Sequence, residues 1–417
     1  MDDHKEPIRY LDLCSGIGGF HQAMDRLGCI CVGASEIDQV CIDTYRANFP
    51  DTPMLGDVRD LDPKDLPDFQ FVCAGFPCQP FSKAGKRKGF KDESRGQLFY
   101  TIMDIIDAHD EVEFILFENV RNLADRKEYW ETIQEELAKR DFTITTRPII
   151  LSPSDFGIPQ IRERVFILGI RSDVKNHDLL PYGQIIEDDL WLRKATCKPN
   201  AAFDILDETP SNPVRLAPDK EEALFAWDEF REEIGITTIG FPIWLSCFGL
   251  GIEFDRTFFN QIGLESMPGW KQNYVRRNRH LYQMNRDYID AWVRRYNMLD
   301  RTKLLQKFEW NCGEDVPDIK HGLVQIRQSG IRVKRPDCFP SLVAMATTPL
   351  IWDESINHFR EITIREAARL QSFDEEFVFT GSSKQVYKEL GNAVNVEIAY
   401  QLAQGLLRLR NSGLTLK

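Results

Sequence analysis

The sequence predicts an α/β protein with a doubly wound domain and a second, smaller domain of mixed structure. Short apolar runs rich in strand formers recur through the first 170 residues, and several end in glycine or a carboxylate. This alternation fades from about Pro181 to Ile356. At 417 residues the chain is also too long for one compact core. We therefore expect two domains.

Composition favours a globular intracellular protein. Hydrophobic residues make up 42% and charged residues 28% of the chain, and no apolar run approaches the length of a membrane span. The first six residues are charged and lack the apolar core of a signal peptide. The ten cysteines form no Cys-x-x-Cys pair and have no histidine at zinc spacing. We expect a cytoplasmic protein with reduced thiols and no metal centre.

Charge is unevenly distributed. The net charge is −13, yet residues 269–307 hold ten Lys or Arg against three Asp, a local excess of +7. Five aromatic residues are interleaved with these charges. A solvated helix face is the alternative interpretation, but the motifs below favour a nucleic-acid contact.

The N-terminal segment predicts a nucleoside site. A strand over residues 9–14 leads into the glycine-rich turn Ser15–Phe20, and Glu36 follows the second predicted strand. Glycines let a backbone approach a ligand, and an acid after strand two commonly binds ribose hydroxyls. Asp57, after the third strand, is suited to an adenine amino group. No phosphate loop or Gly-x-Gly-x-x-Gly spacing is present, which favours S-adenosylmethionine over ATP or NAD.

A cysteine lies where the next strand ends. Residues 69–74 read as a buried strand, and glycine and two prolines then turn the chain around Cys78. The basic loop 83–97 follows. Most such cysteines are small core residues. However, the string Pro-Cys-Gln-Pro-Phe-Ser at 77–82 resembles the signature loop of the cytosine-5 methyltransferases, in which the cysteine attacks the base.

Further motifs follow in the order of that family. Glu118 comes directly after an apolar strand, a Gln-x-Arg-x-Arg pattern ends at Arg164, and Gly-Asn-Ala-Val lies at 391–394. The alternative interpretations are that the glutamate neighbours the N-cap of a helix and that the arginines form surface ion pairs. Together the motifs resemble the DNA (cytosine-5-)-methyltransferase family of bacterial restriction-modification type. The resemblance implies a Rossmann-like, S-adenosylmethionine-dependent methyltransferase domain with a smaller target-recognition domain.

The chemistry implied by the resemblance explains the choice of residues. Carbon 5 of cytosine is a poor nucleophile until a thiolate attacks carbon 6. Cysteine supplies an accessible thiolate that is also a workable leaving group. Protonation or hydrogen bonding of ring nitrogen 3 requires a nearby carboxylic acid, for which we predict Glu118. Because both carbons are hidden in a duplex, the target base is expected to flip out, with the 83–97 loop as its lid.

The resemblance assigns three groups of residues. The catalytic group is Cys78, Glu118, Arg162 and Arg164. The cofactor group is Asp12, Cys14, Gly16, Gly18, Gly19, Phe20, Glu36, Ile37, Asp57, Val58, Pro77, Leu98, Asn392 and Ala393, with Cys14 and Ile37 at positions where the family often has aromatic residues. The substrate group is Phe76, Gln79, Ser82, Lys86, Arg87, Gln160, Arg332, Lys334 and Arg335.

The same resemblance sets the expected organisation. Residues 1–185, completed by a returning helix within 380–417, form the catalytic, cofactor-binding domain, and 186–379 form the target-recognition domain and hinge. Double-stranded DNA is the expected partner of a monomer, together with a cognate restriction endonuclease or other defence proteins. Two alternatives stay open: a tRNA cytosine-5 methyltransferase of the same fold, and a catalytically silent DNA-binding subunit.

Overall fold

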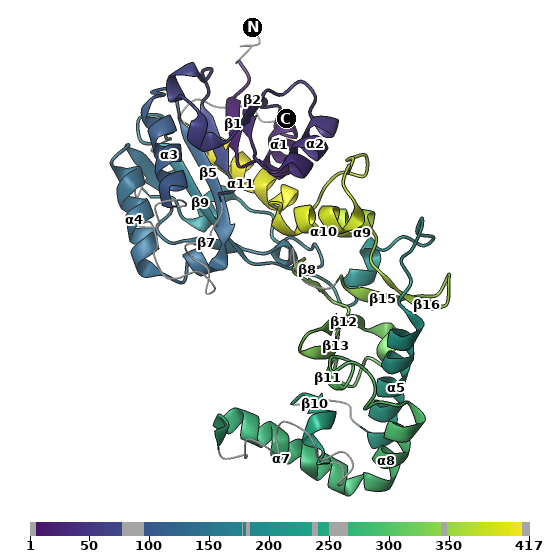
Figure 1. Ribbon diagram of the computed structural model, residues 1–417. Coiled ribbons are helices and arrows are strands. Elements are labelled where there is room, and N and C mark those ends of the chain that lie inside the picture. The colour runs from purple at the N-terminus through teal and green to yellow at the C-terminus, as the bar shows by residue number, and fades with distance from the viewer. Residues whose placement is uncertain are drawn as a thin grey trace. The chain divides into compact units, whose positions relative to one another are not determined.

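The chain folds into two compact units (Figure 1), each treated separately below. The computed structural model describes residues 6–76, 96–176, 178–180, 184–235, 241–249, 266–342 and 348–410. The first unit comprises Met1–Lys198, Pro340–Ala344 and Ala367–Lys417, and the second comprises Pro199–Phe339 and Met345–Glu366. The first unit is therefore assembled from both ends of the chain.

The first unit is built on a mixed eight-stranded sheet in the order β3-β2-β1-β4-β5-β9-β6, with β7 paired to β9. Strands β1 to β5 are parallel, and β6, β7 and β9 run antiparallel to their neighbours. The strands are Arg9–Leu13 (β1), Ile30–Ser35 (β2), Met54–Gly56 (β3), Phe71–Ala74 (β4), Phe114–Val120 (β5), Phe142–Ile144 (β6), Ile149–Leu151 (β7) and Arg164–Arg171 (β9). The strand order reverses between β1 and β4, and ligands of such sheets bind outside the carboxyl ends at this reversal.

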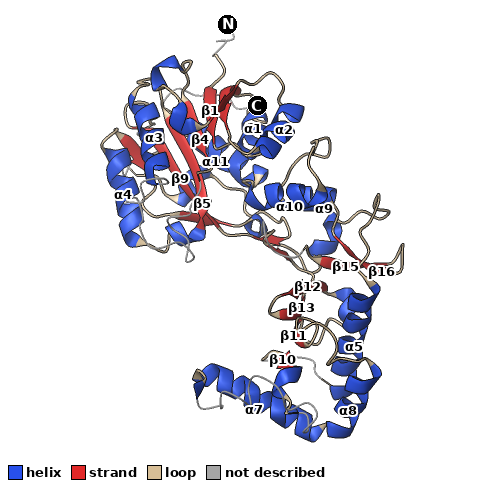
Figure 2. Ribbon diagram, in the orientation of Figure 1, coloured by secondary structure: helices blue, strands red, loops and turns tan. Residues whose placement is uncertain are grey.

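Helices cover both faces of this sheet (Figures 1 and 2). In the figures α3 and α4 lie on one side of the sheet, whereas α1 and α11 lie on the other. The bounds of the unit's helices are Gly19–Asp25 (α1), Gln39–Asn48 (α2), Gly96–Asp107 (α3), Lys127–Ala138 (α4), Ser383–Asn392 (α10) and Val396–Arg408 (α11). Because both faces are covered, the central strands are almost wholly buried and read as apolar runs.

The second unit has its own six-stranded sheet in the order β10-β11-β13-β12-β15-β16, in which only the β11–β13 pair is parallel. The strands are Ile243–Trp244 (β10), Lys307–Asn311 (β11), Leu323–Arg327 (β12), Gly330–Lys334 (β13), Leu350–Asp353 (β15) and His358–Glu361 (β16). Helices α5, α7 and α8 span Pro218–Ile234, Gly269–Met284 and Arg286–Arg295. Alternate residues such as Phe308, Trp310 and Val333 pack with Trp227 and Trp292 in the core.

The remaining elements are short. Strands β8 and β14 span Gln160–Ile161 and Phe339–Pro340, and helix α9 spans Ile364–Leu370. The 3₁₀ helices are Val58–Asp60, Pro63–Asp65, Arg121–Leu123, Pro153–Asp155, Glu187–Leu190, Ala201–Ile205, Leu245–Cys247 and Ile319–His321. No helix in these described parts is long and apolar enough to cross a membrane. The predicted α/β class with a doubly wound sheet is confirmed.

Candidate active site

The glycine turn after β1 is shaped for close contacts. Gly18 has a φ of 91°, and a Cβ there would lie 2.4 Å from the Phe49 ring. A Cβ on Gly19 would lie 2.7 Å from the Val394 carbonyl oxygen, so the turn packs directly against the segment that returns from the end of the chain. Cys14 and Gly16, with φ of 55° and 56°, also adopt left-handed conformations.

Glu36 joins the second strand to this turn. Its Oε2 accepts a hydrogen bond from the Gly16 backbone N–H at 2.9 Å, while Oε1 accepts from the N–H groups of Ile37 and Asp38. Although 20 residues separate them, the predicted acid and the predicted turn therefore meet. Ile37, beside the carboxylate, is 67% exposed and presents an apolar side chain at the carboxyl edge of the sheet.

Two further carboxylates flank the turn and differ in their surroundings. Asp57 caps the short helix that begins at Val58 and binds Arg59, whose hydrogen bonds lower the pKa of the Asp57 carboxyl. Asp12 is fully buried in β1, and neither of its carboxylate oxygens has a well-aligned hydrogen-bond partner in the described chain. Burial, and then the charge of Glu36, raise the Asp12 pKa. A buried acid in this state is suited to a cationic ligand group.

The remaining predicted cofactor residues differ in exposure. Phe20, Val58 and Leu98 are buried in the core, and Ala393 is buried beside the exposed Asn392. The structure therefore brings the turn, Glu36 and the returning segment together at one edge of the sheet. It gives Phe20, Val58 and Leu98 a packing role.

The strand that leads to the predicted nucleophile is fixed at its end. Phe76, two residues before Cys78, is buried, and its carbonyl oxygen accepts a hydrogen bond from Asn119 Nδ2 at 3.2 Å. Asn119 lies in β5 beside Glu118, so the two neighbouring strand ends are tied together. Pro77, Cys78, Gln79, Ser82, Lys86 and Arg87 lie outside the described residues.

Glu118 is a buried acid with an arginine partner. Arg164 Nε lies 2.9 Å from Glu118 Oε1, but the two groups are not aligned for a hydrogen bond. Burial raises the Glu118 pKa, and the positive charges of Arg164 and Arg162 only partly offset this effect. Surface ion pairs of Arg164 with Glu163 or Asp155 do not form, since Glu163 pairs with Arg121. The site therefore lets Glu118 bind a proton more readily than a glutamate in solvent does.

Arg162 and Gln160 lie deeper than an exposed substrate contact would. Arg162 is buried and donates to the carbonyl oxygens of Gly391 at 2.7 Å and Ala393 at 2.9 Å. Burial, followed by the charge of Arg164, lowers the Arg162 pKa to about 9. Gln160 is also buried, and its Oε1 accepts a hydrogen bond from Gln371 Nε2 at 3.1 Å. Both side chains face the returning segment of the first unit.

Sequence reasoning missed the residues that hold the returning segment in place. Asn395 caps α11 by accepting from the Ile398 N–H, and it donates to the Leu370 carbonyl oxygen at 3.2 Å. Asp374 pairs with Arg26 of the first unit at 2.6 Å. In the family that the sequence resembles, proline is frequent at both positions. The absence of proline at these two positions was the available signal. The two side chains form contacts that proline cannot make.

In the second unit the three predicted DNA-contacting residues have different partners. Arg332 makes a bidentate pair with Glu309, at 2.7 and 3.0 Å, across the β11–β13 register. Lys334 is half-buried, and burial followed by the charges of Arg332 and Arg327 lowers its pKa. Arg335 pairs with Asp315 and Asp337 in exposed contacts. Glu309 was not predicted, because strand register cannot be read from the sequence.

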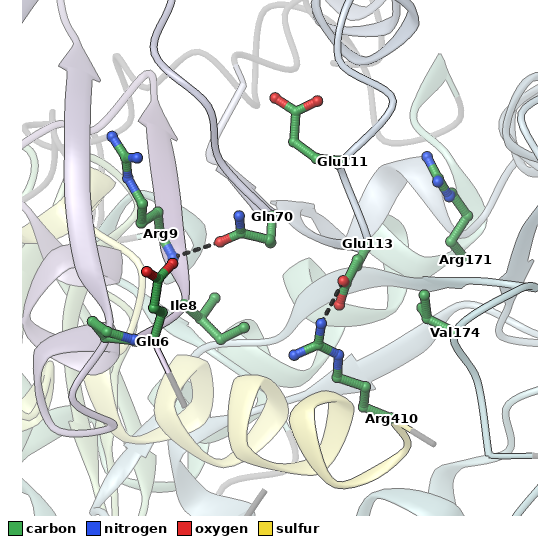
Figure 3. Close-up of a pocket in the computed structure, with 10 residues that line it drawn as sticks. Glu6, Ile8, Arg9, Gln70, Glu111, Glu113, Arg171, Val174 and Arg410 are labelled. Carbon is green, nitrogen blue, oxygen red and sulfur yellow. Dashed lines mark hydrogen bonds and ion pairs between the residues drawn. The ribbon is translucent and has the colours of Figure 1, made fainter. Parts of the chain in front are cut away.

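A cavity of about 400 Å³ lies at the opposite edge of the first unit's sheet (Figure 3). Its walls include Arg9 at the start of β1 and Glu113 just before β5. Arg410 pairs with Glu113 at 2.5 Å, and the Arg9 N–H donates to the Gln70 side chain at 3.0 Å. These are amino ends of parallel strands, whereas the turn, Glu36 and Glu118 lie at carboxyl ends. The cavity is therefore separate from the candidate active site.

Comparison with known proteins agrees with this arrangement. The sequence pattern described as "C-5 cytosine-specific DNA methylase" matches residues 8–408. The chain belongs to this family. It is therefore a cytosine-5 DNA methyltransferase, and the family requires a methyl donor and a DNA substrate.

Two named relatives cover nearly the whole methylase. It is 29% identical to the Type II methyltransferase M.AluI of Cellulosimicrobium cellulans, over 96% of this chain and 92% of the relative. It is 28% identical to M.BanI of Aneurinibacillus aneurinilyticus, over 96% of both chains. M.HpaII of Haemophilus parainfluenzae is 43% identical, but over 40% of this chain and 46% of its own.

Solved structures show the same fold. DNMT2 of Spodoptera frugiperda superposes with a TM-score of 0.57 and 17% identity, covering 96% of this methylase and 99% of that chain. An Escherichia coli prophage-encoded putative DNA modification methyltransferase gives a TM-score of 0.55 and 20% identity, covering 96% and 99%. At these identities the likeness concerns the fold alone.

Proposed function

We propose that this methylase transfers a methyl group from S-adenosylmethionine to carbon 5 of a cytosine flipped out of duplex DNA, through a covalent bond between Cys78 and carbon 6. The observation that carries the proposal is the position of Glu118, a buried acid with a raised pKa beside Arg164. It lies at the end of β5, next to the strand that leads to Cys78. That pairing of a thiol loop and a proton donor matches the needs of the reaction.

The residues present fit S-adenosylmethionine. Buried Asp12, with two poorly satisfied carboxylate oxygens, suits the positive charge of the cofactor. Glu36 lies where a ribose would be bound, exposed Ile37 offers an apolar surface for adenine, and Asp57 can accept from its amino group. Asn392 and Ala393 of the returning segment are proposed to border its methionine end. When bound, S-adenosylmethionine supplies an electrophilic methyl group.

The thiolate of Cys78 is proposed to begin the reaction. Its sulfur lone pair forms the bond to carbon 6, and the carbon 5–carbon 6 π electrons move toward carbon 4. Nitrogen 3 then takes a proton from Glu118, so no free negative charge develops on the ring. Carbon 5 becomes nucleophilic and would take the methyl group from the sulfonium, whose sulfur would leave as the neutral thioether of S-adenosylhomocysteine. Water is proposed to accept the carbon 5 proton. The electron pair of that bond then returns to the carbon 5–carbon 6 bond, the thiolate leaves, and nitrogen 3 returns its proton to Glu118.

The two arginines are proposed to have different roles. Arg164, half-buried beside Glu118, is suited to hold the base oxygen 2 and to favour the Cys78 thiolate. Arg162 donates to carbonyl groups of the returning segment, so it acts as a positioning residue for that segment. Gln160 is proposed to act in the same way through Gln371. These assignments separate substrate contact from support.

The residues around Cys78 are proposed to receive the flipped base. Phe76 and Pro77 would form the base of the pocket, and Gln79 would contact the nucleotide. Ser82, Lys86 and Arg87 would meet the DNA backbone as the 83–97 loop closes. The support for this assignment is the basic, glycine-rich composition of the loop together with the fixed strand end at Phe76.

The second unit is proposed to be the target-recognition domain. Arg332, held by Glu309 in bidentate geometry, and Lys334 lie on alternate residues of β13 and so share one face of the strand. An arginine fixed in this way is suited to the base edge of guanine. Arg335 pairs with two aspartates and is the weaker candidate.

The biological setting is proposed from the relatives. M.AluI and M.BanI are named as Type II methyltransferases, which favours a restriction-modification role with a cognate endonuclease as partner. We further propose that the methylase acts as a monomer in the cytoplasm.

The deciding experiment incubates unmethylated bacterial DNA with the full chain and S-adenosylmethionine, and maps 5-methylcytosine at single-base resolution. We expect methylation within one short sequence, and none with a Cys78→Ala variant. Activity on tRNA but not on DNA would move the assignment to the RNA branch of the fold. Silence on both substrates would favour a DNA-binding subunit without catalysis.

A further inference from the structure

Helix α7 (Gly269–Met284) is positively charged along its whole length and is not used in the proposal above. Between Gly269 and Met284 the chain has four Lys or Arg and no Asp or Glu, although the whole protein carries −13. The basic side chains are Lys271, Arg276, Arg277 and Arg279. A helix of this composition has no internal neutralisation of its charge.

One face of α7 is anchored in the second unit. Val275, Asn278 and Tyr282 are buried at helical spacing. Asn278 Oδ1 accepts from the Trp244 N–H at 2.9 Å, and its Nδ2 donates to the Pro242 carbonyl oxygen at 3.1 Å. Because this face points inward, the residues between its members point outward. The outward residues are Asn273, Arg276, Arg277, His280, Gln283 and Met284, all of them exposed.

The two outward arginines are held by neutral groups. The Arg277 guanidinium stacks over the Phe241 ring, with 4.0 Å from Cζ to the ring centroid. Arg276 Nη2 donates to the Gln272 side-chain oxygen at 3.1 Å, one helical turn away. Neither arginine lies within ion-pair distance of a carboxylate in the described parts of the chain. Both guanidinium groups are thus oriented while their charge stays available.

Helix α8, which follows directly, provides the contrast. Its Arg286 lies 3.7 Å from Asp290, and its Arg295 pairs with Glu229 at 2.7 Å. A merely solvated helix would be expected to carry acids among its bases, as α8 does. The two outward arginines of α7 are therefore suited to an anionic partner.

We propose that the outward face of α7 binds the phosphate backbone of duplex DNA beside the target site. This inference rests on the proposed function, because it adds a contact surface for the same substrate. The helix is about 24 Å long, so its outward side chains can meet several phosphates, which follow one another about every 3.4 Å of axis along each strand. A lipid surface fits less well, because the apolar face of α7 is buried in the unit and exposed Trp270 and Met284 stand at opposite ends.

The proposal predicts a contact that contributes affinity without sequence information. Phosphate contacts fix position on the duplex, whereas base contacts specify the sequence. Loss of the α7 contacts should therefore weaken DNA binding and its salt dependence, and leave the methylated sequence unchanged. That combination distinguishes α7 from a base-reading element.

The test uses the full chain carrying Arg276→Gln and Arg277→Gln together. Its matched control carries Arg215→Gln and Lys220→Gln, which remove the same charge from exposed positions of the same unit outside residues 269–307. The dissociation constant for a random duplex of about 30 base pairs is measured by fluorescence anisotropy between about 50 and 200 mM salt. Circular dichroism and the methylation map of bacterial DNA are recorded for all three proteins.

Each phosphate contact contributes about 0.9 to the slope of log affinity against log salt concentration. With two contacts removed, we expect the α7 variant to lose about tenfold less affinity than the wild type across this salt range. The control variant should match the wild type, and all three should methylate the same sequence. Equal slopes for the α7 variant and the wild type would overturn the proposal. Loss of binding to phosphatidylserine vesicles with unchanged DNA binding would also overturn it. A wild type that binds DNA but forms no 5-methylcytosine would contradict the proposed function instead.

Discussion

Each unit of the molecule holds one glutamate between two arginines, and the two clusters behave in opposite ways. In the first unit Glu118 faces Arg164 and Arg162, and in the second Glu309 faces Arg332 and Arg327. The Glu118 pKa is raised, chiefly by burial. Partial burial acts in the same direction on Glu309, but hydrogen bonds from Arg332 and Asn311 outweigh it and lower the pKa.

The difference lies in solvent and alignment rather than in composition. The Glu118 side chain is 10% exposed and its arginine is poorly aligned, whereas the Glu309 side chain is 23% exposed and accepts a bidentate pair. Charge is costly in the first setting and is compensated in the second. Glu118 thus binds a proton more readily than a glutamate in solvent, as its proposed role requires, whereas Glu309 keeps its charge and orients a guanidinium group.

The largest expected effect comes from removing the proton that Glu118 would give. A Glu118→Gln variant should lower the single-turnover methylation rate by about 10²–10⁴-fold, the usual contribution of a general acid, and leave DNA affinity unchanged. Glu163→Gln is the matched control, because Glu163 neighbours Arg164 in the chain but pairs with Arg121. A rate within threefold of the wild type, or equal losses in both variants, would refute the role given to Glu118.

Arg162 offers a way to separate support from chemistry within the same cluster. Arg162→Met should lower the free energy of unfolding by about 3 kcal/mol, because two buried carbonyl groups lose their charged donor. Urea denaturation monitored by circular dichroism measures this change. Arg164→Met should cost less stability and more activity, since Arg164 is only partly buried. The reverse ranking of the two variants would contradict the division of roles.

The smallest effect, about 1 kcal/mol, should separate the two glutamates by their pH dependence. A pKa that is raised in the folded state stabilises the fold at pH values below the unfolded pKa, and this stabilisation is lost as the pH rises through the folded pKa. Glu118→Gln should therefore gain stability relative to the wild type toward neutral pH. A pKa that is lowered in the folded state stabilises the fold at pH values above the unfolded pKa, and this stabilisation is lost as the pH falls through the folded pKa. Glu309→Gln should therefore be less stable than the wild type at neutral pH and approach it in acid.

Urea titrations of both variants and the wild type between acid and neutral pH measure the comparison. Parallel pH profiles for the two variants would remove the distinction between the clusters. A Glu309→Asp variant, which keeps the charge, should follow the wild-type profile.

What the sequence could predict was local. Strands ending in a glycine turn, in Glu36 and in Glu118 are found by apolar runs followed by a break, and the sheet brings those ends together. Glu309 and Arg332 are 23 residues apart and meet only through the register of their two strands, which no sequence pattern encodes, so their pairing was not predictable. Arg162 was predicted to be catalytic, but a buried guanidinium bound to carbonyl groups cannot be told from an exposed one by spacing alone.

The contact between Gly19 and Val394 has a consequence for how the enzyme comes into being. Strand β1 leaves the ribosome early, whereas α11 follows only after the whole second unit has been synthesised. At about 5–20 residues per second, the first strands wait on the order of tens of seconds for their partner. During translation this edge of the sheet stays incomplete in the nascent chain, and we expect a prematurely terminated chain lacking α10 and α11 to form no 5-methylcytosine.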